Sequence, residues 1–159
     1  MSIHIHRAQP ADAPVITGMA GELLEEIMAA VGAPVFTFDR AGTESRAQIW
    51  LTDGTYAVFL ARQDDGGPTA GFLALYESRA LYAGGTFGTI PELYVRPAFR
   101  SRGIGAALLA EARRFAESRR WARLEVTTPP LPQFERTLAF YERHRFSVSG
   151  GRKMKLDLR

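Results

Sequence analysis

The sequence predicts an α/β (α+β) fold with a single mixed, mostly antiparallel central sheet of about six to seven strands, flanked by about four helices. Short apolar segments of strand length are joined by glycine-containing turns, which indicates antiparallel hairpins. A strand, a helix and a second strand follow one another at 89–96, 103–119 and 122–127, which indicates a parallel crossover. With 159 residues and no linker or repeat, we expect one domain over 1–159.

Hydrophobic periodicity assigns the individual elements. Ile3 and Ile5 alternate with His4 and His6, which is the pattern of a half-buried strand over 2–8. Further strands are expected at 55–62, 69–79, 89–96, 122–127 (buried) and, as a closing antiparallel hairpin, 146–149 and 154–158. Helices are expected at 13–30 with Asp12 as N-cap, at 43–52, at 103–119 and at 133–143. Segment 81–88 is ambiguous, with a turn at 84–85.

Composition excludes several classes of protein. Apolar residues make up 46% and charged residues 23% of the chain, as in ordinary globular domains. No apolar run approaches the ~18–20 residues that cross a bilayer, and the N-terminus lacks the layout of a signal peptide. We therefore expect a cytoplasmic protein with no membrane partner. There are no cysteines, and the three histidines lack metal-ligand spacing, so no metal cofactor is expected.

The net charge is +3, and the arginines are scattered along the chain. The densest groups are 96/100/102 and 113/114/119/120, and the second lies at the C-terminal end of a predicted helix, where cations suit the helix dipole. A nucleic-acid-binding protein usually gathers its charge on one face with aromatic residues between. We expect no nucleic-acid partner.

The segment from Arg100 to Ala106 carries the clearest chemical signal. It joins a predicted strand to a predicted helix that opens at Gly103. Free backbone N–H groups and the positive end of the dipole at such a helix start attract anions. Arg100 and Arg102 are mildly unfavourable there, by about 0.3–1 kcal/mol each, unless an anion offsets them. The segment predicts a phosphate site, and a solvated basic turn is the alternative.

Arg100-x-x-Gly103-x-Gly105, with 92–97 before it and 107–109 after it, resembles the coenzyme A motif of the GNAT (Gcn5-related) N-acetyltransferases. The stretch 140–146 resembles that family's closing Phe-Tyr-x-x-x-Gly-Phe segment, with Arg145 in place of the glycine. The resemblance implies an acyl-CoA N-acyltransferase-like fold with acetyl-CoA as co-substrate. In that family the pantetheine arm inserts between two splayed parallel strands, here 89–96 and 122–127. The implied cofactor-binding residues are Leu93, Tyr94, Val95, Arg100, Ser101, Arg102, Gly103, Ile104, Gly105 and Ala106.

Acetyl transfer to an amine needs a base and an acid. An alkyl ammonium has a pKa near 10.4, so a group that removes its proton assists attack at neutral pH. Glu92 lies on the predicted strand 89–96, on a face shared with Ile90 and Tyr94 by alternation, and we expect it to be the base; a glutamate at a sheet rim is the alternative. Tyr141 matches the family position that commonly protonates the leaving thiolate. It also shares helical spacing with Leu138 and Phe134, so a core residue is its alternative.

The function expected is N-acetyl transfer from acetyl-CoA to a primary amine of a small molecule or peptide. A non-catalytic coenzyme A-binding regulatory module of the same fold is the alternative, and a homodimer stays open. We expect the first two helices and their loop to shape the acceptor pocket. Glu22, Glu25 and Glu26 form either a solvated helix face or an acidic rim for a cationic acceptor.

Overall fold

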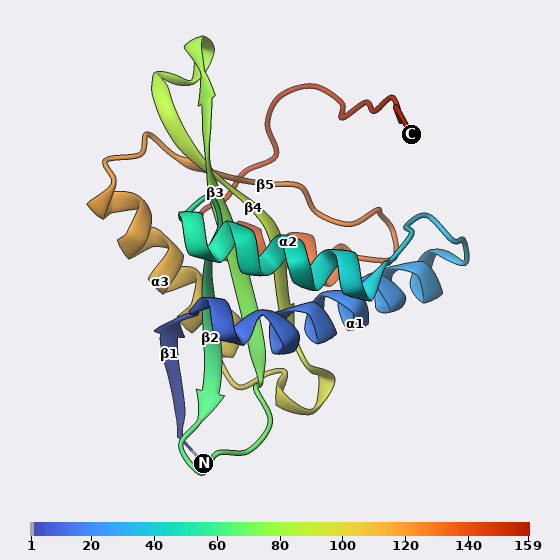
Figure 1. Cartoon of the computed structure of the whole chain (residues 1–159). Helices are drawn as coiled ribbons and strands as arrows, with labels where there is room; N and C mark the ends of the chain where they lie inside the picture. Colours follow the sequence, from blue (N-terminus) through green and yellow to red (C-terminus); the bar gives the residue numbers. More distant parts are fainter. Residues whose placement is uncertain (1) are drawn as a thin grey trace. The chain divides into compact units, whose positions relative to one another are not determined.

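The computed structural model describes residues 2–159 (Figure 1). It contains two compact units, residues 2–127 and residues 128–159, which are described separately below. The expectation of one domain over the whole chain stays a prediction.

A five-stranded sheet forms the centre of the first unit, with the strands side by side in the order of the sequence. They are β1 (Ile3–Arg7), β2 (Ala57–Gln63), β3 (Gly71–Ala80), β4 (Gly85–Val95) and β5 (Leu124–Val126). The pairs from β1 to β4 are antiparallel, and only β4 and β5 are parallel. The predicted mixed, mostly antiparallel sheet is confirmed.

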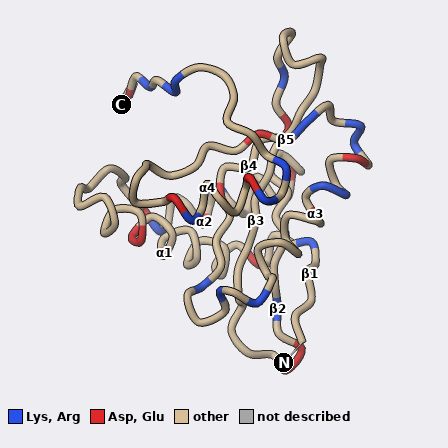
Figure 2. Tube along the Cα trace, turned by 180° about the vertical axis from the view of Figure 1, so that it is seen from behind, with Lys and Arg blue, Asp and Glu red and all other residues tan. Residues whose placement is uncertain are grey.

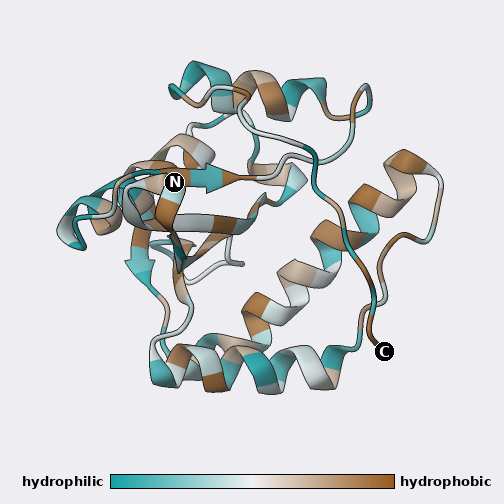
Figure 3. Ribbon diagram, turned by 90° about the horizontal axis from the view of Figure 1, so that it is seen from above, coloured by the Kyte–Doolittle hydropathy of each residue, from teal (hydrophilic) through white to brown (hydrophobic). Residues whose placement is uncertain are grey.

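Helices cover both faces of this sheet. These are α1 (Ala13–Val31), α2 (Arg40–Asp53) and α3 (Ile104–Ser118). Ile16 and Met19 of α1 pack with Leu60 on one face, and Phe59 of β2 contacts Phe115 of α3 on the other. In Figure 1, α1 and α2 cross in front of the sheet, and Figure 3 shows hydrophobic and hydrophilic residues interleaved along the helices, as burial of one side requires.

The pairing of β3 with β4 contains a β-bulge. Ala74 pairs with Glu92, but Tyr76 pairs with Thr89, so β4 has one residue more than β3 between these points. Because paired residues point to the same side of a sheet, Thr89 and Glu92 share a face. The expectation that Ile90 shares the face of Glu92 is therefore wrong. The bulge reverses the alternation that the sequence alone predicts.

Several predicted boundaries are corrected. β4 begins at Gly85 rather than 89, because a short turn at Leu81–Ala83 closes the β3–β4 hairpin earlier. α2 begins at Arg40 rather than 43, after Asp39 as N-cap. β5 has only three residues and is half-buried instead of buried, since it is the edge strand of the sheet.

The predicted closing hairpin is wrong. Among residues 2–159 no strand follows Val126, and the sheet has five strands instead of about six to seven. Met154, Leu156 and Leu158 alternate as a strand would, yet their side chains are exposed. Alternating apolar residues form a strand only where a partner strand can pair with them and an apolar surface can cover their side chains.

The second unit contains one helix, α4 (Glu135–Arg143), close to the predicted 133–143. The ring of Tyr141 on α4 packs edge-on against Phe140 and Phe146, with centroid distances of 5.3 Å in both pairs. Arg145, which replaces the glycine of the resembling motif, has φ of 73°. The arginine thus adopts the left-handed conformation that a glycine would favour.

Three arginines near the end of α3 are paired or stacked. Arg119 lies 4.8 Å from the centre of the Phe115 ring, and Arg114 pairs with Glu111 at 2.5 Å. Arg123 pairs with Glu125 at 2.6 Å. In Figure 2, basic and acidic residues alternate over this region, which differs from the uniform basic face typical of nucleic-acid-binding proteins.

Close approach of β3 to β4 predicts a stability effect. A Cβ at Gly71 would overlap the carbonyl oxygen of Tyr94, whereas one at Gly151 would meet no atom within 4 Å. Gly71→Ala should therefore lower the free energy of unfolding by about 1–3 kcal/mol, the usual cost of overpacking. Gly151→Ala, the control, should change it by less than about 0.5 kcal/mol. Urea denaturation measures both, and equal stabilities would contradict the close approach.

Candidate functional site

A cavity of about 190 Å³ lies in the first unit between the sheet and the two helices on its front face. The helix α1, the loop 32–39, the helix α2 and strands β2 to β4 all contribute side chains to it. That the first two helices and their loop shape an acceptor pocket stays a prediction. The lining residues are Ile16, Thr17, Ala20, Leu23, Leu24, Thr37, Phe38, Thr43, Arg46, Ala47, Trp50, Leu51, Tyr56, Val58, Phe72, Ala74 and Glu92.

The loop enters the cavity wall because a glycine on α1 makes room for it. The ring of Phe38 lies so close to Gly21 that a Cβ there would stand 2.9 Å from its Cε2 atom. Phe38 therefore packs flat against the α1 backbone and lines the cavity, while Phe36 remains 42% exposed.

Glu92 is the only acidic residue of the cavity wall within the described chain. Its Oε1 atom accepts a hydrogen bond of 3.3 Å from the hydroxyl of Tyr56. Burial raises the pKa of the Glu92 carboxyl to about 7, although the Tyr56 hydrogen bond acts in the opposite direction. Burial also raises the pKa of Tyr56, so this hydroxyl stays a donor at neutral pH. A carboxyl with a pKa near 7 exchanges a proton readily at neutral pH.

Aromatic rings extend from Glu92 toward α2. The ring of Tyr56 stacks on Tyr76 with a centroid distance of 5.8 Å and an interplanar angle of 9°. The ring of Trp50 on α2 also contacts Tyr56, with a centroid distance of 4.9 Å and an interplanar angle of 40°. Tyr56 thus packs against two rings while its hydroxyl donates to Glu92. Thr17, fully buried in the opposite wall, has a hydroxyl without a hydrogen-bond partner among residues 2–159.

The backbone of β4 beyond the bulge has one open edge within the first unit. β5 pairs with β4 only at Gly88, Thr89 and Ile90. From Pro91 to Val95, β4 continues beside β3 alone, and no strand of residues 2–127 pairs with its other edge. Leu93, Tyr94 and Val95, the predicted pantetheine-binding residues, lie on this segment. The edge is available to an extended ligand that forms strand-like hydrogen bonds.

The loop after β4 ends in the exposed N-terminus of α3. Gly103 precedes the helix with φ of 78°, and Ser101 has φ of 64°, so the chain turns twice through the left-handed region. In the described chain no acceptor bonds the N–H groups of Ile104, Gly105 and Ala106, whereas that of Ala107 bonds the Gly103 carbonyl at 3.0 Å. Three unpartnered donors at a helix start form a site for an anion.

The two arginines of this loop differ in their contacts. Arg100 donates 2.7 Å hydrogen bonds to the Val95 carbonyl and to Glu26, and its guanidinium lies 5.7 Å from the centre of the Tyr94 ring. Arg102 stands 5.9 Å from the ring centre of Phe99. Arg100 is therefore paired, whereas Arg102 is exposed and has no ion pair among residues 2–159, so the phosphate site and the solvated basic turn both stay open.

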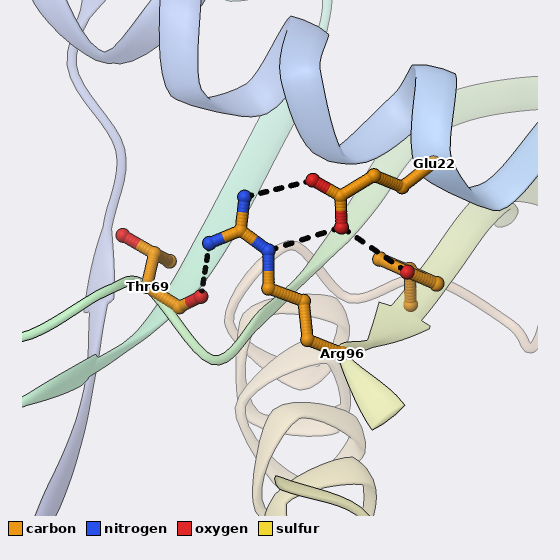
Figure 4. Close-up of polar contacts among 4 residues, drawn as sticks. Glu22, Thr69 and Arg96 are labelled. Carbon is orange, nitrogen blue, oxygen red and sulfur yellow. Dashed lines mark hydrogen bonds and ion pairs between the residues drawn. The ribbon is translucent and has the colours of Figure 1, made fainter. Parts of the chain in front are cut away.

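Arg96, like Arg100, binds a glutamate of α1 (Figure 4). Arg96 donates to both carboxylate oxygens of Glu22, at 3.1 and 2.9 Å, and to the Thr69 carbonyl at 2.9 Å. Tyr94 donates to the same carboxylate at 3.2 Å. The hydrogen bond from Arg96 lowers the pKa of Glu22. Glu22 and Glu26 thus bind arginines of the chain itself, and of the three glutamates expected at the rim only Glu25 has no partner in residues 2–159.

Most predicted site residues are therefore consecutive parts of one segment of the first unit, from Glu92 on β4 to Ala106 on α3. Tyr141 lies in the second unit, where burial raises the pKa of its hydroxyl. Sequence analysis missed Tyr56, Trp50 and Arg96. Arg96 could have been found from the sequence, since it belongs to the motif segment 92–97. Tyr56 and Trp50 belong to no motif, and only the folded structure brings them close to Glu92.

Residues 2–159 have neither the side-chain clusters of a metal site nor the long apolar helix of a membrane span. No cluster of histidine and carboxylate side chains there has the arrangement of a metal site. Within the same residues, no helix combines the length and apolar character needed to span a bilayer.

Residues 54–148, more than half of the chain, match the family model of the acetyltransferase (GNAT) domain. The chain belongs to the GNAT acetyltransferase family. The matched segment begins just before Tyr56 and includes Glu92, the basic loop and Tyr141. No curated protein sequence matches the chain at a significant level.

Solved structures share the GNAT fold over nearly the whole chain. A ribosomal-protein-alanine N-acetyltransferase from Brucella melitensis biovar Abortus 2308 has a TM-score of 0.72 at 21% identity, covering 98% of this chain and 100% of its own. The aminoglycoside acetyltransferase meta-AAC0020 from an uncultured soil metagenomic sample, in complex with sisomicin, has a TM-score of 0.75 at 18% identity (99% and 97% covered). The aminoglycoside N-acetyltransferase AAC(6')-Iy in complex with CoA has a TM-score of 0.78 at 15% identity, covering 99% of this chain and 95% of its own.

The raised pKa of Glu92 predicts a pH-dependent stability. Between its ordinary pKa of 4.5 and the folded value of about 7, the folded protein keeps a proton that the unfolded chain has released. The free energy of unfolding therefore falls as the pH rises from 4.5 to 7, and the total loss above pH 7 is about 3 kcal/mol. Glu92→Gln keeps an acceptor for Tyr56 and removes this loss. The variant should melt higher than the unmodified protein at pH 8 and similarly at pH 4.5.

Thermal melting at both pH values measures this effect. Glu25→Gln, at an exposed position of α1, is the control and should give no pH-dependent difference. A Glu92→Gln variant that gains nothing at pH 8 would mean that the carboxyl is fully solvated.

Proposed function

We propose that the protein is an N-acetyltransferase that moves the acetyl group from acetyl-CoA to a primary amine. The observation that carries the proposal is the position of Glu92. This carboxyl, with a pKa near 7, lies at the wall of a cavity on the strand that runs directly into the coenzyme A motif of the family.

The first unit offers two features that fit coenzyme A. The open edge of β4 at Leu93, Tyr94 and Val95 suits the amide groups of the pantetheine arm. The free N–H groups at 104–106 suit the pyrophosphate, with Ser101, Arg102 and Gly103 completing the turn. Arg100 fixes this turn to the Val95 carbonyl and to Glu26. When bound, acetyl-CoA supplies the activated thioester.

Glu92 would remove the proton that prevents attack. An ammonium that enters the cavity meets one carboxylate, and transfer of its proton to Glu92 leaves a neutral amine with a free electron pair. Tyr56 holds the Glu92 carboxyl in place through the hydrogen bond to Oε1. The amine nitrogen then bonds the acetyl carbon, the carbon–sulfur bond breaks, and the sulfur leaves with the electron pair. The nitrogen loses its second proton and the sulfur gains one, so the products are a neutral amide and the thiol of coenzyme A, with the first proton on Glu92.

Tyr141 is our proposal for the acid that protonates the departing sulfur. Its raised pKa keeps the hydroxyl protonated at neutral pH, and its place in the family's closing motif supports the role. Its ring contacts with Phe140 and Phe146 support a packing role too, and the two roles predict different outcomes for one substitution.

Binding and turnover test the assignment of the cofactor. Acetyl-CoA at about 100 times its dissociation constant should stabilise the protein by roughly 2.7 kcal/mol, measured as a rise in melting temperature. Gly103→Val places a branched side chain at φ of 78° beside the free N–H groups and should abolish the rise. Gly84→Val is the control: it has a similar backbone strain, with φ of 75°, but lies on the hairpin turn. This variant should keep the rise in melting temperature with acetyl-CoA.

The protein should also release free thiol from acetyl-CoA when a suitable amine is added. If acetyl-CoA stabilises the protein but no amine in a broad panel yields thiol, the chain is a coenzyme A-binding module rather than an enzyme. If millimolar acetyl-CoA gives no stabilisation, the cofactor proposal is wrong.

Tyr141→Phe separates catalysis from packing. The variant keeps the ring and its contacts, so the melting temperature should hardly change, and so should the stabilisation by acetyl-CoA. Turnover should fall about 10²–10⁴-fold, the usual effect of losing one acid–base group. Tyr82→Phe, on a side chain that is 79% exposed, is the control and should leave turnover unchanged. An active Tyr141→Phe enzyme with a lowered melting temperature would assign Tyr141 to packing alone.

A further inference from the structure

The wall of the acceptor cavity is poor in charge. Of its seventeen lining residues only Glu92 has an acidic side chain and only Arg46 a basic one; the others are apolar, aromatic or threonine. The nearby carboxylates of Glu22 and Glu26 are already bound to Arg96 and Arg100. The cavity therefore provides one carboxylate for one ammonium group.

Arg46 adds a positive charge on the α2 side of the cavity. It is exposed, and its one hydrogen bond, of 3.4 Å, goes to the hydroxyl of Thr43. Among residues 2–159 it has no carboxylate within ion-pair distance. A second ammonium group on an acceptor would meet this guanidinium or an apolar wall, and burial of an unpaired charge is costly.

The remaining wall suits a compact apolar body. Trp50, Tyr56 and Phe38 present aromatic rings, and Phe72 lies in the sheet beneath them. A cation over such rings gains about 0.5–2 kcal/mol, which adds to the attraction of Glu92. A dry apolar cavity of about 150 Å³ accommodates a benzene molecule, so about 190 Å³ suits a ring with a short alkylamine chain.

We propose that the acceptor is a monoamine with a compact aromatic or branched aliphatic body and no second positive charge. Trp50 and Arg46 are then the residues that determine this specificity, Trp50 by contact with the apolar body and Arg46 by repulsion of polycations. The proposal rests on the acetyltransferase function above and names its substrate class, which differs from the aminoglycoside sisomicin held by one of the similar structures.

The first experiment compares kcat/KM for three probes at saturating acetyl-CoA: 2-phenylethylamine, spermidine and kanamycin. We expect 2-phenylethylamine to exceed both polycations by at least about 100-fold. Trp50→Ala should lower kcat/KM for 2-phenylethylamine by roughly tenfold or more while the stabilisation by acetyl-CoA persists. Ile49→Ala, one residue along α2, 59% exposed and outside the cavity wall, is the control and should change neither quantity.

Arg46→Glu tests the charge argument at an exposed position that the fold should tolerate. It adds a second carboxylate to the wall and should raise the spermidine to 2-phenylethylamine ratio of kcat/KM by about fivefold or more. A spermidine or kanamycin value equal to or above that of 2-phenylethylamine overturns the proposal, and so does an unchanged ratio in Arg46→Glu.

Equilibrium binding keeps this inference separable from the proposed function. With coenzyme A present and no reaction running, 2-phenylethylamine should quench the fluorescence of Trp50, with Trp50→Phe as the blank, and should bind at least about tenfold more tightly than spermidine. If 2-phenylethylamine binds more tightly than spermidine although no amine releases thiol, the proposed specificity of the cavity is supported and only the proposed enzymatic function is wrong. Tighter binding of spermidine, or no quenching by 2-phenylethylamine, overturns the inference regardless of turnover.

Discussion

The bulge in β4 is the feature on which the arrangement of the site depends. Glu92 pairs with Ala74 beside the extra residue, and both side chains line the cavity under α1 and α2. The same region is where pairing with β5 ends, after Ile90. A single local irregularity thus directs an acidic side chain to one face and frees a strand edge for hydrogen bonding. Pro91, which has no N–H to contribute to a ladder, stands at this point.

Electrostatics divides the acidic residues of the first unit into two kinds. Glu22 and Glu26 accept hydrogen bonds from guanidinium groups, so they act as fixed anchors between α1 and the loop after β4. Glu92 has only a tyrosine hydroxyl as its partner and lies in apolar surroundings, so its charge is easily lost. One set of residues holds the site together, and the other is suited to move a proton.

Local sequence determined what could be predicted. The start of α3 was predicted within one residue, because glycine spacing and the apolar stripe are local properties. The importance of Glu92 was foreseen, but its face depended on a bulge that exists only in the pairing with β3. Glu22 and Glu26 were assigned to solvent or substrate because their arginine partners lie 74 residues away in the chain. The tail pattern at Met154, Leu156 and Leu158 gave a false strand, because alternation says nothing about a partner.

The helix α1 belongs to two sites at once. Ile16, Thr17 and Ala20 form part of the cavity wall, while Glu22 and Glu26, one helical turn apart, hold Arg96 and Arg100 of the loop that precedes α3. A ligand that shifts this rigid helix on one side therefore strains or relaxes two ion pairs on the other. Any resulting free energy of coupling is reciprocal: the factor by which an acceptor changes the affinity for the anion equals the factor by which the anion changes the affinity for the acceptor. Such coupling through α1 acts equally in both directions, whichever ligand binds first.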